Sequence, residues 1–151
     1  MLFATHILLG ISLFLLFADF FNGSSQIIFL SLVMLGSILP DIDSSHSKIN
    51  RWSGIIGIII TFFSKHRGLF HSLLFQGILF GVVSYFFSIK YAQALFLGYL
   101  AHVIGDGLTV KGLYLFYPFS QINIRGPIKV GGFIEKIIFL VLVIVIVKQV
   151  L

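Results

Sequence analysis

The sequence predicts an all-α protein, a polytopic integral membrane helix bundle with about five crossings plus a short re-entrant or interfacial helix. Hydrophobic residues make up 58% of the 151 residues and charged residues only 10%, whereas ordinary globular domains are about 25% charged. The apolar residues also fall into long segments that are separated by short polar or Gly-containing turns. At this length we expect one domain, residues 1–151.

The first two segments predict an antiparallel pair of helices. Residues 4–21 form the first, residues 22–25 (Asn-Gly-Ser-Ser) form a tight turn, and residues 26–39 run back. His6 and Asp41 are therefore expected at the same end of the bundle. The N-terminus has no basic region and no small-residue cleavage site, so we expect the first segment to stay in the mature protein.

Two aspartates follow the second segment. Pro40 stops the helix, and an extended alternation after it predicts that Asp41 and Asp43 point the same way. Two carboxylates at the end of a membrane helix are costly unless water, a cation or a metal compensates them. The alternative is a solvated loop with a Ser/Asp cap.

The third segment, residues 54–63, is shorter than a usual crossing, and whether it crosses decides on which side the motifs after it lie. It has ten residues, and a helix needs about 20 to span the hydrocarbon core. A re-entrant or interfacial helix here keeps His66, Arg67 and His71 on the side of the two aspartates. Gly68 is expected to break the helix, so that both histidines turn inward.

Residues 72–87 and 91–105 predict two more helices, and the second brings His102 and Asp106 to the same end. Residues four apart on a helix lie about 5–6 Å apart on one face, which suits a shared metal ion. The alternative is a simple hydrogen bond between the two. Residues 107–132 are expected to lie along the interface, and residues 133–151 to form an anchoring helix that Glu135 caps.

The ten Lys and Arg residues are distributed as topology signals. They are spread over short loops and form no stripe with interleaved aromatics, so nucleic acid is not expected as a partner. Eight fall on the motif side and two on the other, which predicts a multi-pass cytoplasmic-membrane protein with its site facing the cytoplasm. The eight are Lys48, Arg51, Lys65, Arg67, Lys111, Arg125, Lys129 and Lys136, and the two are Lys90 and Lys148.

The candidate metal ligands gather at this one membrane face. Cysteine is absent, so any metal must use imidazole and carboxylate ligands. One ion would take three or four of them, and seven are enough for two ions about 3.5–4 Å apart. His46 is a reserve ligand, and Asp19, near the far end of the first helix, is excluded. The candidate ligands are His6, Asp41, Asp43, His66, His71, His102 and Asp106.

Short motifs follow one another in a fairly specific order over about residues 1–120. They are Thr5-His6, Leu39-Pro40-Asp41-Ile42-Asp43-Ser44, His66-Arg67-Gly68, His71-Ser72, Gly98-Tyr99, His102, Asp106, Thr109 and Lys111-Gly112. In this order they resemble the YdjM-like family of LexA-regulated inner-membrane proteins, which are predicted metal-dependent hydrolases. The sequence departs from the family at Phe70, where threonine is usual, and at residues 54–63, where the family is more polar. The family pattern favours a segment here that does not cross.

The resemblance implies a membrane-bound hydrolase whose metal ligands are these His and Asp residues. Because a site at helix ends opens toward headgroups, we expect a phospholipid or another lipid-linked phosphoester as substrate and membrane lipids as partners. Zinc or manganese is the expected metal, with one or two ions. Arg67 and Lys111 are expected to hold phosphate, and Asp43 or Asp106 to act as general base.

Two other functions fit the same residues. A transporter for metal ions or protons would place ionisable groups near the bilayer midplane and often has inverted repeats, whereas these groups lie at helix ends and no repeat is evident. A non-catalytic membrane protein stabilised by a metal would lack an open coordination position. The number of subunits is left open by the sequence.

Overall fold

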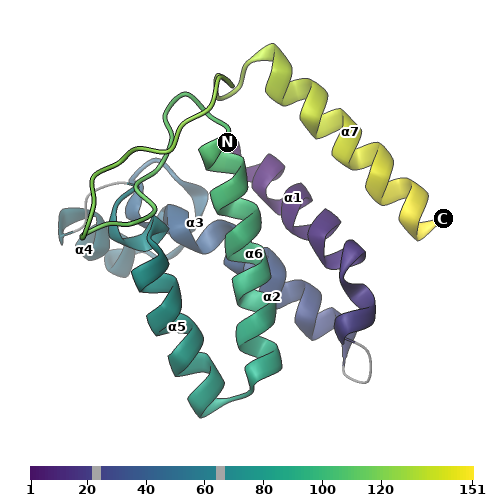
Figure 1. Cartoon of the computed structure of the whole chain (residues 1–151), viewed down its shortest axis with the longest axis horizontal. Helices are drawn as coiled ribbons and strands as arrows, with labels where there is room; N and C mark the ends of the chain where they lie inside the picture. Colours follow the sequence, from purple (N-terminus) through teal and green to yellow (C-terminus); the bar gives the residue numbers. More distant parts are fainter. Residues whose placement is uncertain (22–24, 64–66) are drawn as a thin grey trace.

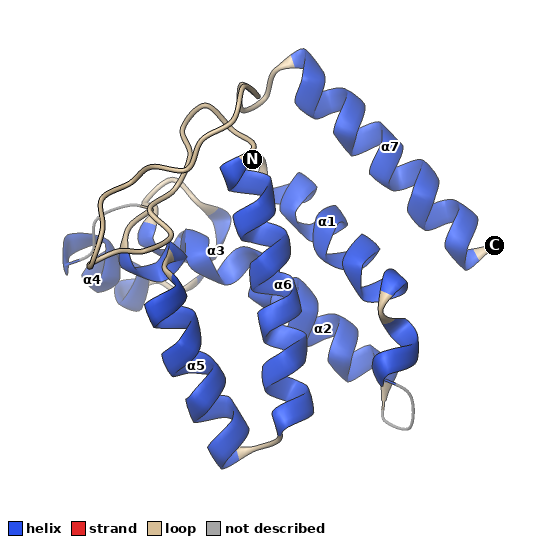
Figure 2. Cartoon of the chain, in the orientation of Figure 1, coloured by secondary structure: helices blue, strands red, loops and turns tan. Residues whose placement is uncertain are grey.

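The computed structural model describes residues 1–21, 25–63 and 67–151, and in them the chain is all-α (Figures 1 and 2). Two isolated bridges, Thr109–Ile128 and Leu113–Ile124, are the β-type pairings. The elements in chain order are α1 (Phe3–Leu16), η1 (Ala18–Phe21), α2 (Gln26–Ile38), η2 (Leu39–Asp43), α3 (Lys48–Trp52), α4 (Ile55–Phe63), η3 (Leu69–His71), α5 (Leu73–Phe86), α6 (Ile89–Gly107) and α7 (Phe133–Val150).

The predicted helical segments are confirmed, with differences at their ends. α1 stops at Leu16, and a separate 3₁₀ turn, η1, completes the segment that was predicted as one helix. α6 is longer than predicted and carries both His102 and Asp106. The irregular stretch between α6 and α7 lies over the end of the bundle where α1 and α2–η2 place His6 and Asp41 (Figure 1).

The expected extended conformation around Asp41 and Asp43 is wrong. Residues 39–43 form the 3₁₀ helix η2, with Pro40 in its first turn, where the missing N–H of proline leaves no helical hydrogen bond unmade. In a 3₁₀ helix, residues two apart point in different directions. Asp41 and Asp43 therefore approach His71 from two sides, Asp41 at Nε2 and Asp43 at Nδ1.

The closest helix packing joins α2 to α6 at two glycines. A Cβ built on Gly36 would lie 2.2 Å from the carbonyl oxygen of Leu95, and one on Gly98 would lie 2.0 Å from that of Val33. The two backbones are therefore in direct contact, which is how small residues let helices associate without a hydrophobic driving force between them. This crossing sets Ser37 on α2 beside His102 on α6.

Gly98→Ala is expected to destabilise the protein by about 1–3 kcal/mol, because the added methyl group forces α2 and α6 apart. The same separation should weaken metal binding through His102. Thermal unfolding in detergent and metal content measure the two effects. Gly77→Ala, on α5 where a Cβ would meet nothing within 4 Å, is the control and should unfold at the wild-type temperature or above it. Equal behaviour of the two variants would contradict the tight crossing.

The chain enters and leaves α4 at the same end of the bundle. This helix has nine residues, about 14 Å of helix. The residues on either side of it meet, because Asp43 before it and His71 after it lie 3.2 Å apart, between Oδ2 and Nδ1. The predicted short segment that does not pass through the bundle therefore agrees with the fold, and α3, before it, is an additional short helix that the sequence did not indicate.

One helical stretch of the described ranges, Gln26–Asp43, is long and apolar enough to cross a membrane by length and composition. α1 and α5 are apolar but have 14 residues each, about 21 Å, which is short of a hydrocarbon core of about 30 Å. α7 has 18 residues and includes Glu135, Lys136 and Lys148. The number of crossings remains a prediction.

Candidate metal centre

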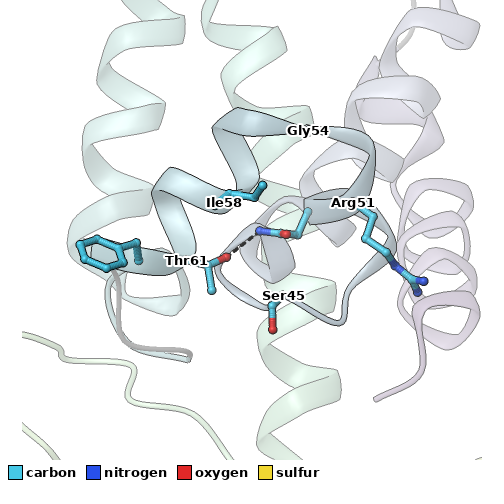
Figure 3. A pocket seen from close by; sticks show the side chains of 7 residues that line it. Ser45, Arg51, Gly54, Ile58 and Thr61 are labelled. Carbon is cyan, nitrogen blue, oxygen red and sulfur yellow. Dashed lines mark hydrogen bonds between the residues drawn. The ribbon is translucent and has the colours of Figure 1, made fainter.

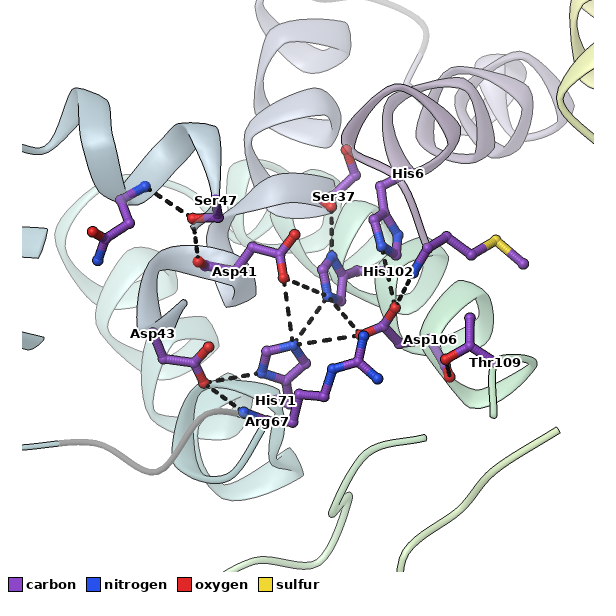
Figure 4. A network of polar contacts seen from close by, with 12 residues as sticks. His6, Ser37, Asp41, Asp43, Ser47, Arg67, His71, His102, Asp106 and Thr109 are labelled. Carbon is purple, nitrogen blue, oxygen red and sulfur yellow. Dashed lines mark hydrogen bonds and ion pairs between the residues drawn. The ribbon is translucent and has the colours of Figure 1, made fainter. Parts of the chain in front are cut away.

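Four side chains from three elements converge at one end of the bundle. Asp41 comes from η2, His71 from η3, and His102 and Asp106 from successive turns of α6 (Figure 4). One ligand atom from each lies within 4.8 Å of every other. His71, His102 and Asp106 are fully buried, and Asp41 is 17% exposed. This four-donor group could hold a metal ion.

The two histidines present their lone pairs to the same point. His102 Nδ1 lies 2.8 Å from the carbonyl oxygen of Ser37, and His71 Nδ1 lies 3.2 Å from the carboxylate of Asp43. Both partners accept hydrogen bonds, so each Nδ1 carries the proton and each Nε2 is left with its lone pair. The two Nε2 atoms are 3.2 Å apart. A cation between them removes the repulsion of two facing lone pairs.

The two carboxylates complete the group at similar distances. Asp106 Oδ2 is 3.8 Å from the Nε2 atoms of His71 and His102. Asp41 Oδ1 is 4.0 Å from the same two atoms. Ligands about 2.0–2.2 Å from a tetrahedral zinc ion stand roughly 3.3–3.6 Å apart. The distances that join the two Nε2 atoms to each other and to the two carboxylates differ from this range by only a few tenths of an ångström, and the two carboxylate oxygens lie within 4.8 Å of each other.

Asp43 lies behind His71 and orients it. Its Oδ2 accepts from His71 Nδ1 and also from the backbone N–H of Arg67, at 3.0 Å. A carboxylate that fixes the outer nitrogen of a metal-binding histidine is common in metalloproteins. Arg67 has φ +62°, a conformation that is uncommon outside glycine. α4 ends at Phe63, and Arg67, not the predicted Gly68, is the residue with a positive φ before His71.

The Arg67 side chain links the four-donor group to the loop that covers it. Nη2 lies 2.9 Å from Asp106 Oδ2, an ion pair that is not aligned as a hydrogen bond. Nη1 donates to the carbonyl oxygen of Gly112 at 2.6 Å. Gly112 has φ +63° and is closely surrounded by residues 123–125, so the loop is fixed where it meets Arg67.

His6 and the N-terminus approach Asp106 from the other side. His6 Nε2 is 3.3 Å from Asp106 Oδ1, and the His6 ring stacks on His102 with centroids 4.0 Å apart. The amino group of Met1 also contacts Asp106 Oδ1. Glu135 of α7 holds this segment in place, because it accepts from the backbone N–H groups of Leu2 and Gly131, each at 2.6 Å.

A pocket of about 360 Å³ opens beside the four-donor group. Asp41 is the member of the group that lines it, and Arg67 reaches it from the interior. The pocket is rich in positive charge, since Lys48, Arg51, Arg67 and Lys111 all contribute to its wall, together with His46. We call it the cationic pocket. Its charge suits an anion that approaches the metal position from the side of Asp41.

Comparison with known proteins places the chain in a family. The family described as YdjM inner membrane protein matches residues 1–150. The chain belongs to the YdjM inner membrane protein family. It is also 34% identical over 137 residues to the protein named "Uncharacterized protein YvsG" of Bacillus subtilis (strain 168), which covers 89% of this chain and 84% of that protein. No solved structure matches the chain.

The YdjM family match confirms the resemblance found in the sequence and extends it from about residue 120 to residue 150. α7 and Glu135 therefore belong to the matched region. The description of the family as an inner membrane protein agrees with the predicted membrane location.

The structure divides the predicted ligands of this YdjM family member into groups. Asp41, His71, His102 and Asp106 form the four-donor group, whereas Asp43 contacts His71, and His6 contacts Asp106 and His102. His66 lies outside the described residues. Lys111 and the reserve residue His46 line the cationic pocket. Sequence reasoning did not predict the contact of the Met1 amino group with Asp106, or the hydrogen bond from Leu2 to Glu135. The signal for the second was an acidic residue, Glu135, in the first turn of an apolar helix.

Asp43→Asn is expected to lower metal affinity by about 10–100-fold, because the amide no longer fixes the Nδ1 proton of His71 as a carboxylate does. Competition with a chromophoric chelator measures the affinity. Asp19→Asn, which changes an exposed carboxylate on η1, is the control and should bind metal like the wild type. An unchanged affinity in Asp43→Asn would contradict the orienting role of Asp43.

Proposed function

We propose that this YdjM family member is a membrane-bound, metal-dependent hydrolase that cleaves a phosphoester bond in a phospholipid or another lipid-linked substrate. The observation that supports it is the opening of a buried four-donor group, through Asp41, onto the cationic pocket. A site that only stabilised the fold would be closed on all sides by protein ligands. Here a phosphate group has both a route to the metal position and positive charge to hold it.

The donor set favours one zinc or manganese ion. Two imidazoles and two carboxylates suit borderline and hard divalent cations and exclude sites that depend on thiolates. Arg67 and the Met1 amino group both contact Asp106, so they balance part of its negative charge. Two ions per chain in elemental analysis would show that residues beyond the four-donor group also bind metal.

A divalent cation in this position supplies Lewis acidity, which activates water and offsets the charge that develops on the phosphoryl oxygens. The residues of the chain supply the rest. Arg67 and Lys111 hold the phosphate from two walls of the cationic pocket. We take His71, His102 and Asp106 as the metal ligands, which would leave the fourth position open toward the cationic pocket. Asp43 and Asp106 are buried and engaged with His71 and Arg67. Asp41, which lines the pocket, is therefore the carboxylate best placed to accept a proton from water there.

The exposed surface supports a membrane setting. α4, α5 and α7 expose many large apolar side chains, among them Phe62, Ile78, Val82, Phe133 and Leu140, each more than 45% exposed. Apolar patches of this extent are rare on soluble monomers and mark contact with lipid or protein. The cations around the pocket, together with the positive-inside bias of the sequence, support a site that faces the cytoplasm.

Transport and purely structural metal binding have less support. A transporter site is expected near the bilayer midplane between broken helices, whereas the four-donor group lies at the C-terminal end of α6 and beside the chain terminus. A structural site has no need of a cationic pocket. Both nevertheless make distinct predictions, which the following experiment separates.

The test is hydrolysis of phosphatidic acid and phosphatidylglycerol in mixed micelles, by protein that was purified without chelators and loaded with zinc or manganese. The wild type is expected to release product, Asp41→Asn to lose at least about 100-fold in kcat, and Lys111→Gln to raise KM. Lys148→Gln, in the last turn of α7 and outside the lining of the cationic pocket, is the control and should have the kcat and KM of the wild type. Bound metal without hydrolysis of any phosphoester would overturn the proposal and favour a structural ion.

A further inference from the structure

A second and larger cavity adjoins the cationic pocket. It has a volume of about 620 Å³ and lies between α4 and the segment formed by residues 44–47 and α3 (Figure 3). Gly54, Ile58 and Thr61 contribute from the side of α4, and Ser45 and Arg51 from the other side. We call it the α4 groove. It does not touch the four-donor group, so it is not the metal position itself.

The α4 groove and the cationic pocket are neighbours that meet at Arg51, whose side chain lines both. Ser44 lies in the wall of the pocket and Ser45 in that of the groove, so one short turn separates the two spaces. A molecule with an anionic head in the cationic pocket can therefore extend past Arg51 into the α4 groove. Its volume is in the range of sites that hold ligands, about 300–1,000 Å³.

The interior of the α4 groove is suited to an apolar group because the side chains of Asn50 and Thr61 are already engaged in hydrogen bonds. Asn50 Nδ2 donates to the carbonyl oxygens of Ile42 and Gly57 and to Thr61 Oγ1, at 2.6–2.8 Å. Thr61 Oγ1 in turn donates to the Gly57 carbonyl at 2.8 Å. An apolar chain that enters here leaves no hydrogen bond broken, whereas a polar ligand would find few partners.

α4 also gives the α4 groove a route to the lipid phase. Ile55, Ile56, Ile58, Ile59 and Phe62 are 52–82% exposed on a helix of nine residues. An apolar helix of this length that begins and ends at one side of the bundle lies in the membrane interface. In that setting, lipid chains would reach the groove on the side away from the metal position.

We propose that the α4 groove holds an acyl chain of the lipid whose phosphate occupies the cationic pocket. This proposal rests on the proposed function for the identity of the phosphate-bearing substrate. It makes Ile58 a residue that determines specificity, since its side chain limits the space for the chain. Arg51, at the junction, sets where the headgroup ends and the chain begins.

The test is the binding of phosphatidic acids with acyl chains of four, six and eight carbons, compared with inorganic phosphate, to the metal-loaded full chain by calorimetry. Each buried methylene is expected to tighten binding by about fourfold. Ile58→Trp, which fills the α4 groove, should lose this dependence on chain length and still bind inorganic phosphate. Ile56→Trp, on the exposed face of α4 and outside the groove lining, should keep it.

A second variant guards against a folding defect. Ser45→Phe fills the α4 groove from the opposite wall, and its effect should match that of Ile58→Trp, with metal content unchanged in both. Chain-length dependence that survives in both variants would overturn the groove assignment even if lipid phosphoesters are hydrolysed. If no phosphoester is hydrolysed but the dependence is lost in both variants, the proposed hydrolase fails and the α4 groove stands as a lipid site.

Discussion

His102→Ala is expected to remove the metal ion and to abolish metal-dependent hydrolysis. His102 contributes one of four converging donors, and its Nδ1 is held on the backbone of α2 by the Ser37 carbonyl. Truncation therefore deletes a ligand and leaves a cavity between His6 and His71, both of which contact the ring. Metal affinity should fall by more than the roughly 10–100-fold that loss of an outer-shell partner costs.

Elemental analysis of the purified wild type and of His102→Ala measures the metal content per chain. The wild type should hold about one equivalent of transition metal per chain and His102→Ala almost none. His46→Ala is the matched control, because His46 is exposed and lies outside the four-donor group, and it should keep the full equivalent. If the wild type binds no metal and His102→Ala unfolds at the same temperature, the metal centre would be refuted.

Removal of the metal by a chelator is expected to lower the free energy of unfolding by about 4 kcal/mol when the free metal was 1,000 times its Kd. The structural reason is that the ion compensates the two facing lone pairs of His71 and His102 and the carboxylates of Asp41 and Asp106. Without it, His71 and His102 repel each other at 3.2 Å. The loss should appear as a lower temperature of thermal unfolding in detergent.

The control for this measurement is the chelator's effect on His102→Ala. That variant binds little metal, so chelation should leave its unfolding temperature unchanged. A fall of equal size in wild type and variant would mean that the chelator acts elsewhere, and no fall in a metal-loaded wild type would show that the ion contributes nothing to the fold.

The sequence predicted the helices and the meeting of the polar motifs, because both follow from local patterns. Apolar runs bounded by Gly, Pro and Ser turns define α1, α2, α5, α6 and α7, and their antiparallel order brings Asp41 and His102 to one end. The spacing of four residues between His102 and Asp106 on one helix placed the two side chains together, as the structure has them.

The remaining features depend on contacts between distant parts of the chain. The different directions of Asp41 and Asp43 follow from η2, whose conformation only packing decides. The dual role of Arg67, with its main chain on Asp43 and its side chain on Asp106 and Gly112, joins segments up to 45 residues apart. The α4 groove and the contact of Glu135 with Leu2 form between residues whose positions in the sequence follow no regular spacing, so no sequence pattern predicts them.

The backbone contacts of Gly36 with Leu95 and of Gly98 with Val33 have a consequence for how new specificities can arise. They fix α2 against α6 without the help of side chains, so the part of the molecule that carries His102 and Asp106 tolerates little change. The segment from Ser44 to Phe62 borders both cavities but takes no part in that crossing. Mutations there can reshape the choice of substrate while the chemistry is preserved, which makes this segment the natural target for directed evolution.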